Sequence, residues 1–203
     1  MNKNSEISNG MKILIVSSYL PYPLLDGGRI RLYNLLKFLK DRHEITLICE
    51  KWPPQTQEDV NEVSKVCHKT VVIERPKTWS IRNISKTLLS FNSLLLTAHT
   101  NKKITKAIQK ELEAEKFDLI HVETFYVMQN LPKVNLPIVL VEHNIEYMVY
   151  EKYVKKAPLL LRPALYIDIL KLKRIEKNSW KKADKLIAVS PKEQKIMGDN
   201  VEL

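Results

Sequence analysis

The sequence is poor in residues that support specialised folds. Its 203 residues include only two cysteines, Cys49 and Cys67, and only four glycines. Two cysteines cannot build a framework of disulfides, so we interpret them as reduced thiols in a reducing compartment. An apolar content of 44% favours a compact, helix-rich globular protein over a fibrous or disordered chain. The sequence therefore predicts a fold stabilised by its hydrophobic core.

Long apolar runs are also missing. No run approaches the roughly 20 residues that a helix needs to span a bilayer. Residues 1–10 are polar and lack the apolar core of a signal peptide. We expect them to form a disordered extension, followed by a single domain over residues 11–203. A cytoplasmic location follows from these expectations.

The common nucleotide-binding and catalytic motifs do not occur. The fingerprints GxGxxG and GxxxxGK[ST] are absent, which argues against a dehydrogenase, a P-loop NTPase and a nucleotide-sensing or flavodoxin-like domain. No GxSxG turn offers a nucleophilic serine. The five histidines show no HxxxH spacing, so we expect neither a metal nor a covalently bound cofactor. His121 lies within a predicted strand, and we interpret it as structural.

Charge of one sign dominates. The chain has 33 basic and 23 acidic residues, a net charge of +10 and a pI near 9.5, which favours anionic partners. Much of the basic excess lies in the Lys-rich segment 152–185, where lysines alternate with apolar and aromatic residues. Such a segment either lies on an anionic membrane or forms an ordinary helix with lysines in water. No element for base reading or stacking is evident, so nucleic acid is not an expected partner.

Short apolar segments alternate with helical patterns along the chain. The predicted strands are residues 13–16, 44–49, 70–73, 117–122, 138–141 and 186–189. Amphipathic or helix-forming patterns cover residues 30–39, 55–67, 101–116, 127–131, 159–183 and 192–197, while residues 80–100 predict two less regular helices. This alternation is typical of a doubly wound α/β domain, with a mainly parallel sheet and helices on both faces.

A pair of glycines, Gly27 and Gly28, stands between the first strand and its helix. A helix N-terminus offers free backbone N–H groups and the positive end of the helix dipole to an anion. One interpretation is that both glycines let these N–H groups approach a phosphate or a sugar, with Arg29 adding charge. The other is that the pair merely lets the chain turn. Arg31 would add charge in the same way, but we interpret it rather as a residue that faces solvent.

Polar residues follow three further predicted strands. Glu123 follows the fourth strand, Glu142, His143 and Asn144 end the fifth, and Ser190 follows the sixth. Ligands of open parallel sheets bind outside the carboxyl ends of the strands, so these five residues are candidates for lining a cleft. The imidazole of His143 suits a hydrogen bond to a sugar hydroxyl, or it gains basicity from a neighbouring carboxylate, or it bonds to nearby loop carbonyls. Ser190 is alternatively a helix N-cap.

Four segments together resemble a known family. MKILIVSSYLPYPLLDGGRIRLYNLLKFL, FDLIHVE, VEHNIEY and ADKLIAVSPKE are similar to the amino-terminal half of GT-B fold glycosyltransferases, with the nearest resemblance to family 4. The resemblance covers about residues 11–203. It implies a retaining hexosyltransferase that uses a nucleotide sugar. It also implies that Gly27 and Gly28 approach the donor phosphates and that His143 contacts the donor sugar.

The resemblance also implies what lies outside the sequence. Family members hold most of the nucleotide in a carboxyl-terminal domain with a Glu-x₇-Glu motif, and the sequence stops at Leu203 before such a domain. We therefore expect the chain to be a fragment, a truncated product or half of a split enzyme, with negligible transferase activity alone.

The implied role is that of an acceptor-side domain in surface polysaccharide or glycolipid synthesis. Its acceptor would be a glycan or a lipid-linked molecule, met in the cytoplasm or on the inner face of the plasma membrane. The alternative is a non-catalytic module of the same fold that binds a phosphorylated or lipid-linked ligand.

Overall fold

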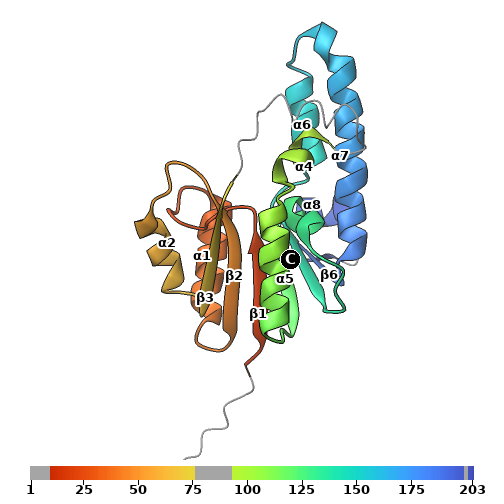
Figure 1. The fold of residues 1–203 in the computed structure, drawn as a ribbon. Coiled ribbons are helices and arrows are strands. Elements are labelled where there is room, and N and C mark those ends of the chain that lie inside the picture. Colours follow the sequence, from red (N-terminus) through yellow and green to blue (C-terminus); the bar gives the residue numbers. More distant parts are fainter. Residues whose placement is uncertain (1–9, 76–92, 199–200) are drawn as a thin grey trace, which may run out of the picture.

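A parallel sheet of seven strands forms the centre of the computed structural model, which describes residues 10–75, 93–198 and 201–203 (Figure 1). The strands are β1 (Lys12–Ser17), β2 (Glu44–Lys51), β3 (Lys69–Glu74), β4 (Leu119–Glu123), β5 (Ile138–Glu142), β6 (Lys185–Ala188) and β7 (Val201–Glu202). Their order is β3-β2-β1-β4-β5-β6-β7, and every neighbouring pair is parallel. The strand order reverses beside β1, which places a topological switch point between β1 and β4.

Helices cover both faces of the sheet. The helices are α1 (Gly27–Leu39), α2 (Gln57–Ser64), α4 (Leu94–His99), α5 (Lys102–Ala114), α6 (Glu146–Val154), α7 (Arg162–Lys182) and α8 (Pro191–Met197), with two 3₁₀ turns, η1 (Phe125–Asn130) and η2 (Leu159–Leu161). Helices α1 and α2 pack on one face, while α4, α5, α6, α7 and η1 contribute to the core on the other.

The alternation of side chains along β1 explains why its sequence is continuously apolar. Ile13 and Ile15 pack into the core beneath α1, whereas Leu14 and Val16 pack into the core on the opposite face. A strand buried on both faces needs apolar residues at every position. The predicted doubly wound α/β fold, with its parallel sheet and two helical layers, is confirmed.

The structure differs from the sequence predictions in several local features. Helix α6 and strand β7 were not predicted, and the long helix predicted over 159–183 begins at Arg162, after the separate turn η2. The strand predicted over 117–122 lies at Leu119–Glu123. The first predicted helix in 80–100 and nearly all of the polar extension 1–10 lie outside the described residues.

Helices α6 and α7, joined by η2, pack against each other as a hairpin that projects beyond the sheet (Figure 1). Helix α7 has 21 residues and is therefore about 30 Å long. From its middle to its end nearest the sheet, α7 buries Ile169, Leu172 and Trp180 in the core. Among the residues that the structure describes, no helix has both the length and the apolar character needed to cross a membrane.

Burial in the α1 core predicts a large cost for shortening Leu36, which is fully buried. We expect Leu36→Ala to lower the free energy of unfolding by about 2–5 kcal/mol, because it removes buried methyl groups and leaves a cavity. The matched control is Leu170→Ala on α7, where the leucine is 66% exposed and the change should stay within about 0.5 kcal/mol. Urea unfolding of both variants measures the difference, and equal losses would contradict this assignment of the core.

Candidate functional site

A pocket of about 770 Å³ lies at the carboxyl edge of the sheet. Its lining comes from the segments that follow β1, β2, β4, β5 and β6, together with the first turn of α1. It therefore lies at the switch point, where ligands of doubly wound folds bind. Of the predicted site residues, Gly27, Gly28, Arg29, His143 and Asn144 line it.

The glycine pair forms the first turn of α1, after the N-cap residue Asp26. The Asp26 carboxylate accepts a hydrogen bond from the backbone N–H of Arg29 at 3.0 Å. The N–H groups of Gly27 and Gly28 have no partner in the described structure, as expected for the first residues of a helix. Neither glycine has a positive φ, so the backbone conformation does not require glycine there.

Close approach, rather than conformation, distinguishes the two glycines. A Cβ at Gly28 would lie 3.2 Å from the hydroxyl of Tyr19, whereas a Cβ at Gly27 would have no atom within 4 Å. Only Gly28 therefore lies where a side chain would disturb a pocket residue.

The two arginines that line the pocket both have acidic neighbours. Nη1 of Arg29 is 3.4 Å from Asp26, and Nη1 of Arg31 donates a hydrogen bond of 2.8 Å to Glu123. The prediction that Arg31 faces solvent is wrong, because α1 turns this residue toward the sheet. With both guanidinium groups beside carboxylates, the pocket is less cationic than the net charge of the chain suggests.

Glu123 is fully buried and accepts hydrogen bonds from three side chains. Its Oε1 accepts from Arg31 at 2.8 Å and from Nε2 of His121 at 2.9 Å, and its Oε2 accepts from Nε2 of His143 at 2.7 Å. Burial opposes ionisation of this carboxyl, but hydrogen bonds from His121 and His143 outweigh it and lower its pKa to about 2. The sequence predicted that Glu123 lines the pocket, but it does not. It instead holds Arg31 and His143, which do line the pocket.

Tyr19 and Glu146 add polar groups near His143. The Tyr19 hydroxyl lies 3.2 Å from Nε2 of His143, and burial raises the pKa of this phenol. Burial also raises the pKa of Glu146, against hydrogen bonds with Tyr126 and Asn144 that lower it. All five residues line the pocket.

Glu142 and Ser190 do not line the pocket, contrary to the prediction. Glu142 is 1% exposed and its Oε1 accepts a hydrogen bond of 3.3 Å from the indole of Trp180 on α7. Burial and the charge of Glu176 raise the pKa of Glu142 well above its usual range. Ser190 is the N-cap of α8, as the alternative interpretation held: its hydroxyl accepts from the N–H of Glu193 at 3.3 Å.

Ser18 and Thr124, from the loops that leave β1 and β4, also line the pocket, as do Trp52 and Tyr126, which the sequence did not single out. Trp52 and Tyr126 each follow a predicted strand within a few residues, so examining every strand end would have found them. Thr124 has a φ of 69°, a conformation that costs a non-glycine residue about 1–3 kcal/mol and is frequent at functional sites. Its hydroxyl lies 3.4 Å from that of Ser18.

The pocket combines hydroxyl, amide, imidazole and carboxylate groups with the aromatic rings of Trp52 and Tyr126. Hydroxyl groups of a ligand both donate and accept hydrogen bonds, so closely spaced donors and acceptors suit a polyhydroxylated molecule. A few fixed polar groups among aromatic rings are typical of sites for small molecules. Within the described ranges, no three His, Cys, Asp or Glu side chains are arranged to hold a metal ion.

The different surroundings of the two glycines predict different effects of alanine. In Gly28→Ala the new methyl group must displace the Tyr19 hydroxyl by a few tenths of an ångström, which we expect to weaken its contact with His143. Gly27→Ala meets no atom and is the matched control. The measurement is the NMR chemical shifts of the His143 ring, which should move in Gly28→Ala alone. Equal shifts in both variants would show that the two positions are equivalent.

Two solved structures resemble this fold. The similarity to a UGT transferase from Siraitia grosvenorii in complex with UDP has a TM-score of 0.50 at 8% identity and covers 92% of this chain but 46% of that one. The similarity to the N-terminal domain of trehalose-6-phosphate phosphatase from Candida albicans has a TM-score of 0.42 at 14% identity, covering 96% and 43%. The first supports the fold alone, and this chain spans less than half the length of each protein. No curated protein matches the sequence at a significant level.

The sequence itself matches a family model over most of its length. The matched residues are 25–202, which include α1, the candidate residues from Gly27 to Ser190, and every strand after β1. The model is that of Glycosyltransferase Family 4, in agreement with the resemblance of the four sequence segments. The chain therefore belongs to glycosyltransferase family 4.

Proposed function

We propose that this chain is the acceptor-side domain of a retaining hexosyltransferase. It would help to move a sugar from a nucleotide sugar to a glycan or lipid-linked acceptor in surface polysaccharide or glycolipid synthesis. The observation that carries this proposal is the pocket at the switch point, where His143 and the first turn of α1 lie together in a chain of family 4.

The polar groups of the pocket support a sugar as the ligand. Its two arginines have carboxylate neighbours, so the remaining recognition groups are mostly neutral or acidic, as in Asn144 and Glu146. Such groups suit hydroxyls better than a highly charged anion. The free N–H groups of Gly27 and Gly28 then provide a limited site for the donor phosphates. A nucleotide as part of the donor agrees with the UDP complex of the similar UGT transferase.

In this proposal the chemistry depends on preorganised polar groups. Retention of configuration needs no protein nucleophile if the leaving phosphate and fixed dipoles stabilise the transition state. His143, held at Nε2 by Glu123 at 2.7 Å, orients the donor sugar and stabilises developing charge.

The first test removes the imidazole of His143 in the full-length natural protein. We expect His143→Ala to lower turnover about 100-fold or more with the UDP-sugar, chosen from a panel that includes UDP-glucose, that the unmodified protein uses best, since losing one preorganised polar group costs this much in comparable sites. The exposed His68 supplies the matched control, His68→Ala, which should keep full turnover. Release of UDP in the presence of a lipid extract as acceptor source measures both. Ligand binding without turnover in the unmodified protein would support the non-catalytic module instead.

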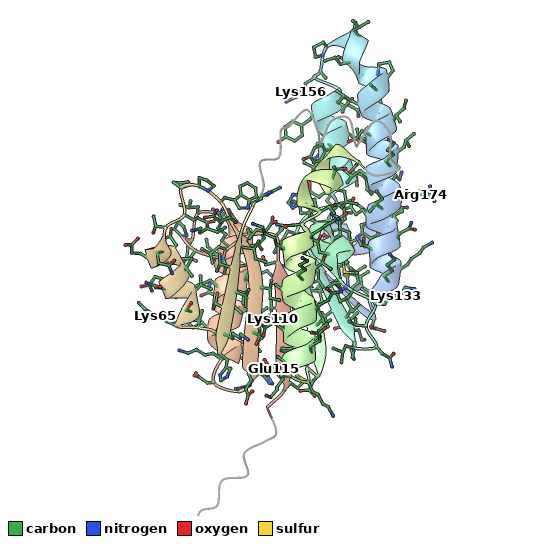
Figure 2. All side chains as sticks on the ribbon, viewed as in Figure 1. Lys65, Lys110, Glu115, Lys133, Lys156 and Arg174 are labelled. Carbon is green, nitrogen blue, oxygen red and sulfur yellow. The ribbon has the colours of Figure 1, made fainter. Side chains whose placement is uncertain are left out.

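We further propose that the α6–α7 hairpin docks on an anionic membrane, on the inner face of the plasma membrane. At its tip, Leu159, Leu160 and Leu161 are 76%, 92% and 53% exposed. Exposed Lys152, Lys155 and Lys156 lie nearby in the sequence, and Figure 2 shows Lys156 near the tip. Leucines beside lysines favour the boundary between lipid tails and anionic headgroups.

The membrane proposal predicts a sharp effect of one tip residue. Leu160→Glu should weaken binding to vesicles of phosphatidylglycerol and phosphatidylcholine about 30-fold, because burying a leucine contributes about 2 kcal/mol. The matched control is Leu25→Glu, which changes a leucine that is 74% exposed outside the hairpin. Cosedimentation measures binding. Undiminished binding of Leu160→Glu, or equal binding of the unmodified chain to vesicles of phosphatidylcholine alone, would contradict this proposal.

A further inference from the structure

We propose that Glu123 is a positioning residue that holds the proton of His143 on Nε2 and leaves Nδ1 as the ring nitrogen available to a ligand. Glu123 itself does not line the pocket, so it acts through His143, which does. The expected effect on turnover rests on the glycosyl transfer proposed above. The position of the proton on the His143 ring rests on the geometry alone.

The parallel register brings Glu123 and His143 together. Glu123 of β4 pairs with Val141 of β5, and His143 lies two residues beyond Val141, at a spacing that returns a strand's side chains to the same face. His121, two residues before Glu123, lies on this face for the same reason. Arg31 reaches it from α1, which packs on this side of the sheet.

The chemistry of a carboxylate determines which atoms carry protons. An ionised carboxylate only accepts hydrogen bonds, so each nitrogen in contact with Glu123 must donate. Nε2 of His143, at 2.7 Å, and Nε2 of His121, at 2.9 Å, therefore both carry hydrogen. In a neutral imidazole the other nitrogen, Nδ1, then has a free lone pair. Within the described part of the chain, Nδ1 of His143 has no hydrogen-bond partner.

The same assignment determines the role of the Tyr19 hydroxyl. Since Nε2 of His143 carries the proton, it cannot accept a hydrogen bond from Tyr19, whose oxygen is 3.2 Å away. The phenol oxygen instead accepts part of the same N–H bond, and its own proton remains available for another acceptor. Tyr19 and His143 thus offer one donor and one acceptor in the same pocket. This pair is complementary to a hydroxyl group, which both accepts and donates.

A second buried glutamate shows that the arrangement is specific. Glu142 ends the neighbouring strand and is almost as deeply buried as Glu123. Among the described residues, its donors are the indole of Trp180 and the backbone N–H of Phe125, so only one side chain donates to it. Its pKa is raised, whereas that of Glu123 is lowered. A buried carboxylate remains ionised only when several donors replace the water it has lost. Arg31, His121 and His143 provide that replacement for Glu123.

The experiment records ¹⁵N NMR spectra of the histidine rings in the unmodified chain and in Glu123→Gln. In the unmodified chain, His143 should show the Nε2–H form at neutral pH. The glutamine oxygen should stay with Arg31 and His121, the two donors that share Oε1, and its NH₂ group should face His143. His143 must then accept at Nε2, so its proton should move to Nδ1 while His121 keeps the Nε2–H form.

Glu142→Gln is the matched control, because it makes the same substitution at an equally buried glutamate whose side chain accepts from Trp180 and not from the ring of His143. It should leave the Nε2–H form of His143 unchanged. Glu123→Asp, which retains a carboxylate, should also retain this form. The proposal is overturned if His143 of the unmodified chain carries its proton on Nδ1, a result that requires no variant to fold. It is also overturned if His143 keeps the Nε2–H form in folded Glu123→Gln.

Turnover of UDP-glucose by the full-length protein then tests the functional consequence. Partners that orient metal-binding histidines contribute about 10–100-fold to activity, and we expect a loss in this range in kcat for Glu123→Gln, with KM little changed. A proton shift without loss of kcat would overturn the positioning role in catalysis. In the unmodified protein, absence of turnover of UDP-glucose and of every other nucleotide sugar in a panel would instead refute the proposed glycosyl transfer, and the NMR result alone would then decide the role of Glu123.

Discussion

Three hydrogen-bond donors from three elements meet at the buried carboxylate of Glu123, and the organisation of the pocket depends on this contact. Arg31 comes from α1, His121 from β4 and His143 from the end of β5. Because a buried ion is costly without its partners, these elements are held in one relative position. His143 in turn contacts the hydroxyl of Tyr19, and this hydroxyl lies so close to Gly28 that a side chain there would displace it.

The alternation of side chains gives two similar glutamates opposite roles. Glu123 and Glu142 each end a central strand and each has at most 1% exposure, so neither their burial nor their position in a strand separates them. Glu123 faces α1 and the residues of the pocket, whereas Glu142 faces Trp180 of α7. One face supplies cationic and N–H donors, and the other supplies apolar packing and a second carboxyl. The groups on each face of the sheet therefore determine whether the pKa of the carboxyl is lowered, as in Glu123, or raised, as in Glu142.

The distribution of charge separates the pocket from the hairpin. Although the chain carries a net charge of +10, Arg29 and Arg31 in the pocket both have carboxylate neighbours. Exposed lysines and arginines occur along the hairpin instead, among them Lys156 between α6 and η2 and Arg174 on α7, both labelled in Figure 2. Net charge is a property of the whole surface, and only the structure shows that it is not concentrated at the site. The pocket suits hydroxyl groups, while the hairpin tip combines leucines with positive charge.

The sequence by itself determined the fold class, six of the strands, the place of Gly27, Gly28 and Arg29 at the start of a helix, and that of His143 and Asn144 at a strand end. These features follow from local rules, because apolar periodicity and strand polarity are properties of neighbouring residues. Helix α6 could not be found this way: its first N–H groups bond to Glu176, 30 residues away on α7. Likewise, only tertiary structure decided that Arg31 bonds to a buried carboxylate, that Glu142 lies outside the pocket and that Glu123 accepts a hydrogen bond from His143. Each of these outcomes depends on which distant element packs against a given face, and a strand's own sequence does not encode its neighbour.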